Sequence, residues 1–367
     1  MIKILYVNGS LMDRGGISNF LMNCFNHIDR SLIHIDFAVM GKGEGERDKE
    51  IKEAGANIYE ITPKSENYFK HIRELKNVMM HANYEIVHAN CDAGNALVLK
   101  IAKKCDVPVR ISHSHNTDFL TNNWIRVAAN KMQRSQIPKY ATNLWACSSE
   151  AGEWLYGGKK IYEIIHNAID LQKFRFSETL RNEYRNKYGI GDKYVIGNIG
   201  RFDYQKNQHF LLNTFAEALK SDPDCLLMLV GDGVDRSVIE KQIESLGITG
   251  KVILTGQVNN ANEIINAFDV FVLPSHFEGL GIALIEAQAN GLYCVVSSCV
   301  PFSSDVTKRV KYLSLDEEYK QWNEEILNAM ARNPMVIEQV RDAGYDICME
   351  IKRIQNLYID LANSHVK

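Results

Sequence analysis

Short apolar runs alternate with longer amphipathic segments along almost the whole chain, and this alternation constrains the fold more than any other feature. The run IKILYV at 2–7 is followed, after a loop, by helical periodicity over 17–28. The run at 86–89 is followed in the same way by a helical segment at 93–104. Such repetition predicts an α/β fold, with parallel strands covered by helices on both faces. Ligands of these sheets bind beyond the carboxyl ends of the strands.

The length of the chain indicates two such sheets. A chain of 367 residues exceeds the size at which a single core stops growing. A polar, charged stretch at 172–193 separates two sets of predicted strands, and we place the division near Leu171. The expected domains are therefore residues 1–170 and 171–344, followed by a last long helix.

Composition is that of a soluble globular protein. The chain is 46% hydrophobic and 24% charged, and its net charge of −3 gives no reason to expect a nucleic-acid partner. The eight cysteines are scattered and form no C-x-x-C pair, so reduced thiols are expected. No run of 18 or more apolar residues is present, and residues 1–8 do not form a signal peptide. We expect a cytoplasmic protein.

A strand, a glycine-containing loop and a helix follow one another at 270–287. The strand is the apolar run at 270–273, the loop carries Gly279 and Gly281, and helical periodicity begins near Ile282. The first N–H groups of a helix lack partners within it, and the helix dipole favours negative charge there. This segment therefore predicts an anion site.

Two carboxylates flank the predicted anion site. Glu278 lies in the loop and Glu286 in the helix, with seven residues between them. An ionised carboxylate only accepts hydrogen bonds, so sugar hydroxyls suit it better than a diphosphate does. The pattern predicts a site for a sugar attached to a nucleoside diphosphate. Two glutamates at this spacing also occur by chance in a chain so rich in charge.

Two cations follow the strand at 194–199, which opens the second predicted domain. Arg201 supplies a planar fork and Lys206 a point charge, a combination that suits a pyrophosphate, although both could also be surface cations in a loop. The G-x-G at 231–233 lacks the third glycine and the distant carboxylate of a dinucleotide fingerprint. We interpret it as a βα turn, which disfavours a dehydrogenase.

Two histidines stand where the predicted strand at 107–112 ends. His113 and His115 could be metal ligands, but no further cluster completes a metal site, and a structural role for either stays open. Gly15 and Gly16 precede the first helix. Glycine there allows close approach of the backbone to a ligand, or simply forms a βα turn.

Taken together, these motifs resemble those of retaining glycosyltransferases with the GT-B fold, in particular glycosyltransferase family 4. The E-x7-E signature is matched by Glu278 and Glu286, and G-R-x-x-x-x-K-[NG] by residues 200–207. The segment N-G-[IV]-D-x-x-x-F is matched at 167–174, except that Ala168 replaces the glycine. The chain looks most like enzymes that assemble bacterial capsular polysaccharide or exopolysaccharide.

The resemblance implies two Rossmann-like domains that face each other across a cleft, with the helix at 345–367 packed back on the first domain. It implies transfer of a sugar from a nucleotide-diphosphate sugar, expected to be a UDP-sugar, to a saccharide or lipid-linked acceptor in cell-surface polysaccharide synthesis. Glu278 would hold the donor sugar, Glu286 the ribose, and His115, or else His113, would face the reacting centre. The catalytic residues implied in this way are His115, Glu278, Arg201 and Lys206, and the donor-binding residues are Gly16, Arg201, Lys206, Val258, Glu278, Gly279, Leu280, Gly281, Ile282 and Glu286.

No metal or other cofactor is expected. The D-x-D at 222–224 precedes a strand and so lies at the wrong end for a ligand, while Arg201 and Lys206 supply positive charge. Two other functions remain open. A nucleotide-sugar 2-epimerase of the same fold would convert the sugar without an acceptor, and a non-catalytic subunit would bind the nucleotide sugar only.

The stretch at 100–147 is basic although the chain as a whole is slightly acidic. It contains eight Lys or Arg residues and two Asp residues. The predicted helix at 124–135 begins with Trp124 and Ile125, so this stretch could meet an anionic membrane from the cytoplasmic side. A merely solvated helix face is the alternative.

Overall fold

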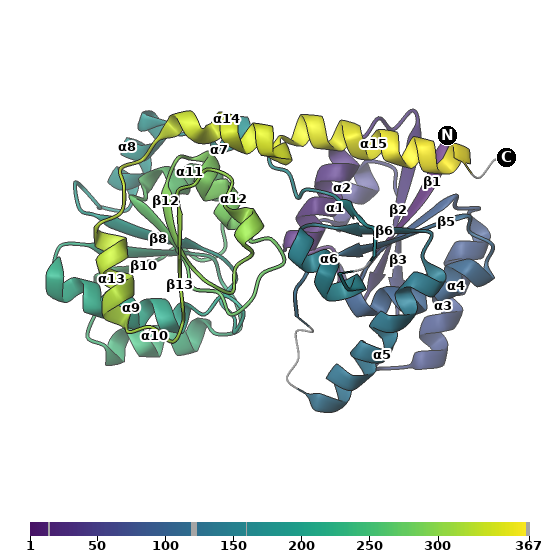
Figure 1. Ribbon diagram of the computed structural model, residues 1–367, viewed down its shortest axis with the longest axis horizontal. Helices are drawn as coiled ribbons and strands as arrows, with labels where there is room; N and C mark the ends of the chain where they lie inside the picture. Colours follow the sequence, from purple (N-terminus) through teal and green to yellow (C-terminus); the bar gives the residue numbers. More distant parts are fainter. Residues whose placement is uncertain (14, 119–122, 159, 365–367) are drawn as a thin grey trace. The chain divides into compact units, whose positions relative to one another are not determined.

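The chain folds into two compact units, each built on its own parallel sheet (Figure 1). The computed structural model describes residues 1–13, 15–118, 123–158 and 160–364. The first unit comprises Met1–Ala168 and Ile347–Lys367, and the second comprises Ile169–Asp346. The divisions lie two residues from those expected, because Ile169 forms an isolated bridge with Asp346 and so belongs with the second unit.

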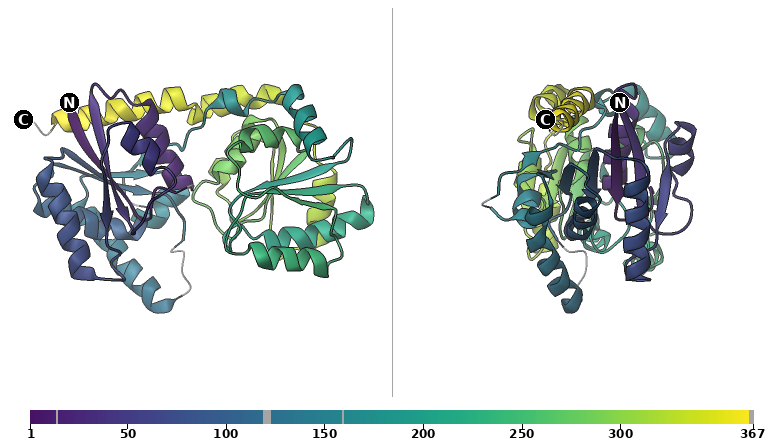
Figure 2. Two further views of the ribbon diagram at one scale, coloured as in Figure 1. Left: turned by 180° about the vertical axis from the view of Figure 1, so that it is seen from behind. Right: turned by 90° about the vertical axis from the view of Figure 1, so that its right-hand side faces the viewer.

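The described residues of the first unit form a seven-stranded sheet in the order β3-β2-β1-β4-β5-β6-β7. Its strands are β1 (Ile2–Asn8), β2 (Ile33–Met40), β3 (Ile58–Ile61), β4 (Ile86–Asn90), β5 (Val109–Ser114), β6 (Asn143–Ala146) and β7 (Glu163–Ile164). Its helices are α1 (Gly16–His27), α2 (Asp48–Glu53), α3 (Tyr68–His81), the 3-10 turn η1 (Asp92–Gly94), α4 (Asn95–Lys104), α5 (Trp124–Tyr140), α6 (Ser149–Tyr156) and α15 (Ile347–Ser364). Figure 2 shows helices on both faces of this sheet.

Both faces of the first sheet are buried, as a parallel sheet requires. Along β1, Ile4 and Tyr6 point into a cluster that includes residues of α1 and α15, whereas Leu5 and Val7 point into a cluster with α3 and α4. This alternation explains why β1 is a continuous apolar run. Tyr358 of α15 is fully buried in the first cluster, so the last helix is part of the first unit's core.

The described residues of the second unit form a six-stranded sheet in the order β10-β9-β8-β11-β12-β13. Its strands are β8 (Val195–Ile199), β9 (Leu226–Val230), β10 (Val252–Leu254), β11 (Val270–Leu273), β12 (Tyr293–Ser297) and β13 (Val310–Leu313). Its helices and turns are α7 (Leu171–Phe174), α8 (Glu178–Lys187), α9 (Gln208–Ser221), α10 (Arg236–Ser245), α11 (Ala261–Ile264), η2 (Ile265–Ala267), α12 (Ile282–Ala289), η3 (Phe302–Ser304), α13 (Tyr319–Leu327), η4 (Pro334–Val336), α14 (Ile337–Val340) and η5 (Arg341–Tyr345).

The strand order of the second sheet reverses between β8 and β11. β9 and β10 follow β8 on one side, and β11, β12 and β13 extend on the other. At such a point the loops that follow the two neighbouring strands run in opposite directions and leave a crevice beyond the carboxyl ends of the strands. Ligands of open α/β sheets bind in this crevice. The loops after β8 and β11 carry the two motifs singled out in the sequence.

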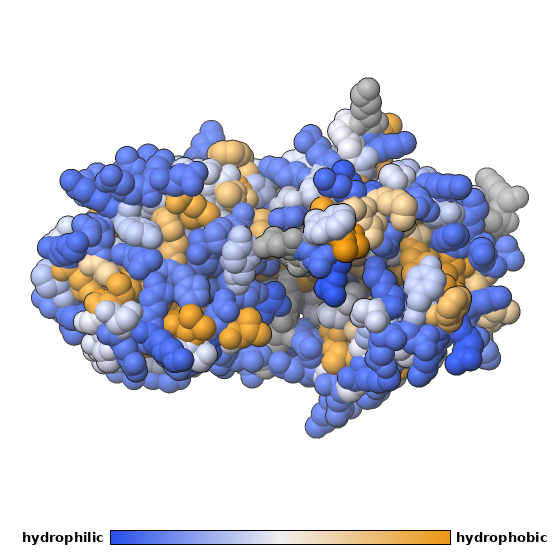
Figure 3. Space-filling view, turned by 90° about the horizontal axis from the view of Figure 1, so that it is seen from below, coloured by the Kyte–Doolittle hydropathy of each residue, from blue (hydrophilic) through white to orange (hydrophobic). Residues whose placement is uncertain are grey.

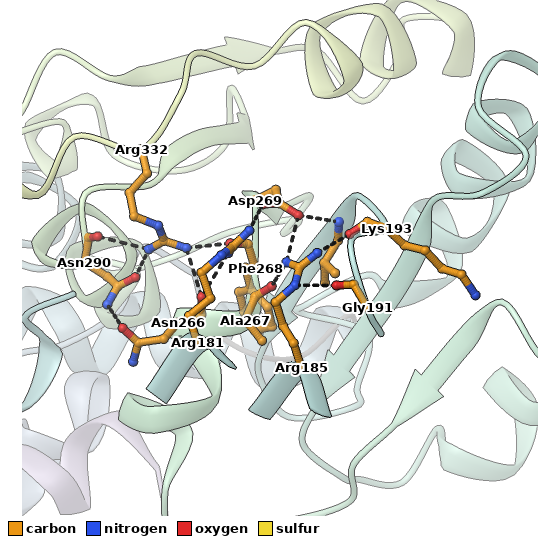
Figure 4. Close-up of polar contacts among 11 residues, drawn as sticks. Arg181, Arg185, Gly191, Lys193, Asn266, Ala267, Phe268, Asp269, Asn290 and Arg332 are labelled. Atoms are coloured by element: carbon orange, nitrogen blue, oxygen red, sulfur yellow. Dashed lines mark hydrogen bonds and ion pairs between the residues drawn. The ribbon is translucent and has the colours of Figure 1, made fainter. Parts of the chain in front are cut away.

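Three arginines make polar contacts at the amino-terminal edge of this sheet, opposite the two motif loops (Figure 4). Asp269, just before β11, is paired with Arg181 at 2.5 Å and with Arg185 at 3.3 Å. Arg332 donates to the carbonyl of Phe268. The guanidinium groups thus satisfy a carboxylate and carbonyls that precede a buried strand, and they fix α8 to the sheet.

Among the described residues, no helix combines the length and the apolar character needed to cross a membrane.

Candidate functional site

The loop after β11 holds Glu278 in a fixed position. The hydroxyl of Ser275 donates to Glu278 Oε1 at 2.6 Å, and the hydroxyl of Ser297, on β12, donates to the carbonyl of Ser275. The hydroxyl of Ser304 donates to the carbonyl of Leu280 further along the loop. Hydroxyl groups from the neighbouring strand and its following turn therefore anchor this loop, and Glu278 is only 4% exposed.

The loop after β8 brings Lys206 to Glu278. The ammonium Nζ of Lys206 lies 2.6 Å from Glu278 Oε1. Gln205 Nε2 donates to the carbonyl of Phe277 at 3.1 Å and to Glu278 Oε2 at 3.4 Å. The N–H of His276 in turn donates to the carbonyl of Gln205 at 2.8 Å. The two motif loops are thus joined into one site, and both carboxylate oxygens have partners, as a buried carboxylate requires.

Arg201 reaches away from this pair into solvent. Its side chain is 65% exposed, and Nε lies 2.5 Å from Asp203 Oδ2. The other oxygen of Asp203 accepts from the backbone N–H of Lys206 at 3.2 Å. Asp203 therefore pairs with the Arg201 guanidinium and binds the backbone of Lys206 in the same loop. The sequence reasoning missed this residue, because a variable position inside the motif gave no signal.

The G-x-G turn after β9 packs directly against the Arg201 loop. A Cβ atom at Gly231 would lie 2.0 Å from the carbonyl oxygen of Gly200, and one at Gly233 would lie 2.2 Å from that of Phe202. Both glycines are thus required for close backbone packing. This requirement supports the interpretation of the segment as a βα turn.

Helix α12 begins at the same edge of the sheet. Gly281 precedes it in the left-handed region, with φ 78°, and Ile282 is its first residue. Gly279 and Leu280 lie in the loop between Glu278 and the helix, so the helix start adjoins the Lys206–Glu278 pair. The positive end of the helix dipole therefore lies beside this pair and favours an anion.

Glu286 lies one turn into α12 and differs from Glu278 in its electrostatics. Burial raises the pKa of Glu286 to about 8, and the charge of Lys206 only partly opposes this rise. At neutral pH the carboxyl group is therefore mainly protonated and can donate as well as accept a hydrogen bond. A carboxyl group held protonated in this way differs from the ionised acceptor expected from the sequence. Val258, in the loop after β10, is partly buried against the same apolar cluster as β11.

His115 follows β5 in the first unit, and it is held by Asn90, the last residue of β4, and by Asp92, in the turn that follows β4. His115 Nε2 lies 2.8 Å from Asn90 Oδ1, and its backbone N–H donates to Asp92 Oδ1 at 3.0 Å. The amide nitrogen of Asn90 donates to the carbonyl of His88, so Nε2 of His115 must carry the proton. Its Nδ1 is buried without a partner among the described residues, and burial lowers the pKa of His115 to about 3. His115 therefore presents a neutral, accepting nitrogen.

His113 belongs instead to a buried chain of aromatic residues. Its Nδ1 lies 3.1 Å from His88 Nε2, and His88 Nδ1 lies 2.7 Å from the hydroxyl of Tyr358 on α15. That hydroxyl lies 3.0 Å from the hydroxyl of Tyr6. Burial lowers the pKa of both His88 and His113 well below the usual range, so both are neutral. Sequence reasoning identified neither this chain nor Asn90 and Asp92.

Gly16 is the first residue of α1, and the structure places no steric demand on it. Apart from its neighbours in the chain and the backbone of its own helix, a Cβ atom at Gly16 would have no heavy atom of the described residues within 4 Å. Gly16, His113 and His115 belong to the first unit, and the other predicted site residues belong to the second.

Comparisons with known proteins agree with this architecture. The family model described as Glycosyl transferases group 1 matches residues 181–344, which include both motif loops and α12. The chain is 31% identical to the putative glycosyltransferase EpsF of Bacillus subtilis, over 97% of this chain and 96% of that protein. It is 26% identical to the capsular polysaccharide biosynthesis glycosyltransferase CapH of Staphylococcus aureus, over 98% and 99% of the two chains.

A third relative is named for its substrates. It is the UDP-Gal:alpha-D-GlcNAc-diphosphoundecaprenol alpha-1,3-galactosyltransferase of Escherichia coli, 26% identical over 80% of this chain and 79% of that protein. Among solved structures, Anabaena HepE in complex with UDP-glucose aligns with a TM-score of 0.71 at 17% identity, over 100% and 98% of the two chains. The fold is therefore that of GT-B glycosyltransferases, and the chain belongs to the group 1 glycosyltransferase family.

Proposed function

We propose that this glycosyltransferase is a retaining family 4 enzyme that transfers a sugar from a UDP-sugar to a saccharide or lipid-linked acceptor in cell-surface polysaccharide synthesis. The observation that carries the proposal is the convergence of Lys206, Glu278 and the start of α12 at the switch point of the second sheet. The names of CapH and of the E. coli galactosyltransferase support the polysaccharide and the lipid-linked acceptor. The complex of HepE with UDP-glucose supports the donor.

In this proposal each group has a distinct role. Arg201 and Lys206 bind the diphosphate and stabilise the charge that grows on it as the glycosidic bond breaks, an effect on the order of 3 kcal/mol for one donor group. Glu278 accepts hydrogen bonds from the donor sugar, and Glu286 binds the ribose. His115 offers Nδ1 to a hydroxyl beside the anomeric carbon. The acceptor attacks from the face that the diphosphate leaves, and the departing phosphate takes the acceptor's proton.

The two cations supply the charge that a divalent metal would otherwise provide, so we propose transfer without a metal ion. Activity that is unchanged after chelation with EDTA is the expected result. Loss of activity that returns on addition of Mg²⁺ would contradict this part of the proposal.

We also propose that the enzyme works in the cytoplasm, at the inner face of the cell membrane, through α5. Trp124, Ile125, Lys131 and Met132 share one side of this helix, and Trp124 and Ile125 are 77% and 60% exposed. The basic stretch at 100–147 includes residues 119–122, which lie outside the described residues. Figure 3 shows a surface that is hydrophilic over most of its area and carries separate apolar patches.

The experiment that tests the function is a thermal-shift panel of nucleoside diphosphates and nucleotide sugars without metal. A ligand at 100 times its dissociation constant stabilises the folded state by about 2.7 kcal/mol. A shift with uridine nucleotides that disappears in Arg201→Ala is expected. No shift with any nucleotide would overturn the proposed donor site. Conversion of the sugar in the absence of an acceptor would favour a 2-epimerase, and binding without turnover would favour a non-catalytic subunit.

A further inference from the structure

Two aromatic side chains stack on each other between the loops that follow β8 and β11. The ring centroids of Tyr204 and His276 lie 4.4 Å apart, and the ring planes are 17° from parallel. Tyr204 is 61% exposed, so its ring is not part of the apolar core of the second unit. Rings in stacked pairs attract each other beyond the area that they bury. The stack therefore joins the two motif loops at the surface of the protein.

Gln205, the neighbour of Tyr204 in the chain, connects this stack to the carboxylate of Glu278. The backbone N–H of His276 donates to the carbonyl of Gln205 at 2.8 Å. Gln205 Nε2 donates to Glu278 Oε2 at 3.4 Å. The other oxygen, Oε1, is held by Lys206 and by Ser275, each at 2.6 Å. Gln205 and Lys206 thus hold different oxygens of the same carboxylate.

The partners of the two oxygens differ in how they respond to a diphosphate. The ammonium group of Lys206 is attracted to the negative charge, so Glu278 loses a charged partner while it stays buried. A buried carboxylate that loses such a partner is destabilised and moves unless other groups hold it. Gln205 is neutral, so it keeps its contact with Glu278 as long as its loop stays in place. The stack and the N–H of His276 hold that loop without the help of Lys206.

We propose that this stack keeps Gln205 on Glu278 when the donor diphosphate draws Lys206 away. Tyr204 and His276 are then positioning residues for the donor sugar. This inference rests on the proposed function, in which Glu278 accepts hydrogen bonds from that sugar. A nucleoside diphosphate without a sugar gains nothing from an oriented Glu278. The stack therefore strengthens binding of the nucleotide sugar relative to the nucleoside diphosphate, and it leaves binding of the nucleoside diphosphate unchanged.

The test compares the dissociation constants of UDP and UDP-glucose, or of the pair that the thermal-shift panel identifies, by calorimetry on the full-length protein. Tyr204→Ala removes the stack and should lower the affinity for UDP-glucose relative to UDP about fivefold. Tyr204→Phe keeps the ring and should retain the wild-type ratio. Tyr188→Ala is the matched control, because it removes a ring that contacts Tyr184 before the start of β8, at the opposite edge of the sheet.

A second variant shows whether the stack acts through Gln205. Gln205→Ala should lower the affinity for UDP-glucose relative to UDP to a similar extent. The double variant with Tyr204→Ala should show no further loss, because both changes release the same contact with Glu278. Losses that add in the double variant would mean that Tyr204 acts by another route, and they would overturn the positioning role.

Binding of the nucleoside diphosphate separates this inference from the proposed function. Failure of the wild type to bind any nucleotide would overturn the proposed function. Normal nucleotide binding with the same affinity ratio in wild type and Tyr204→Ala would overturn the inference alone. Equal weakening of UDP and UDP-glucose in Tyr204→Ala would also overturn it, as would an equal loss in Tyr204→Phe or in Tyr188→Ala. Thermal unfolding of each variant without ligand checks that it remains folded.

Discussion

Lys206 Nζ and Glu278 Oε1 lie 2.6 Å apart, although the two residues are 72 positions apart in the chain. The pair forms because β8 and β11 are neighbours in the sheet. A diphosphate that binds at the start of α12 competes with Glu278 for the ammonium group. We therefore expect donor binding to redistribute this ion pair, leaving the carboxylate for sugar hydroxyls.

Removal of the carboxylate should abolish transfer while the fold persists. Glu278→Ala loses the acceptor for the sugar hydroxyls, and Glu278→Gln keeps the shape and the bond from Ser275 but not the charge. Both variants should lose about a hundredfold or more in kcat. Rates are measured with the identified donor, and circular dichroism monitors the fold. A folded variant of either kind with unchanged kcat would contradict the role of Glu278.

The raised pKa of Glu286 predicts a stability that falls as the pH increases. Burial raises the pKa of Glu286 to about 8 in the folded protein, whereas the ordinary glutamate pKa of 4.5 applies in the unfolded chain. Between these values the folded state binds more protons, so this group makes the free energy of unfolding decrease with rising pH. Thermal unfolding of wild type and Glu286→Gln should therefore diverge from pH 5 to pH 8, with the variant relatively more stable at pH 8. Parallel curves would show that burial does not retain the proton.

The contact between Asn90 and His115 predicts a change in the pH profile. In Asn90→Asp a carboxylate faces Nε2 and raises the pKa of His115 from its value of about 3. A protonated His115 can no longer accept a hydrogen bond at Nδ1, so kcat should fall at low pH, below a pKa higher than in wild type. The pH dependence of kcat is compared in the two proteins, with nucleotide binding as a control. Superimposable profiles would rule out a positioning role for Asn90.

The exposed side of α5 predicts binding to anionic lipid. Lys131→Gln combined with Lys139→Gln should weaken sedimentation with phosphatidylglycerol vesicles and leave binding to phosphatidylcholine vesicles unchanged, because each basic residue near the surface contributes about 1 kcal/mol. Arg134 is unsuitable for this test, since it donates to the carbonyl of Trp154 at 2.7 Å and so supports α6. Equal sedimentation of the double variant and the wild type would remove the membrane surface from the proposal.

The alternation of apolar and amphipathic segments was sufficient to predict the parallel sheets, because strands buried on both faces are continuous apolar runs. The same apolar runs show where each strand ends, so Arg201, Lys206 and Glu278 could be placed in the loops that follow strands. The sequence did not reveal Asp203, Asn90 or Asp92, because each acts through a short side-chain contact that no local sequence pattern specifies. The protonation of Glu286 was equally inaccessible, since it depends on burial by neighbours from elsewhere in the chain.

Tyr358 has a consequence for how the protein is made. This residue fills the core of the first unit and meets His88, yet it lies beyond the whole of the second unit in the chain. During synthesis the second unit can fold once its last residues, up to Asp346, have left the ribosome. The first unit, although its strands emerge earlier, must wait with an uncovered apolar face until α15 arrives. The first unit therefore begins to emerge before the second unit but completes its fold after it. The first unit is thus the one exposed longer to chaperones and proteases.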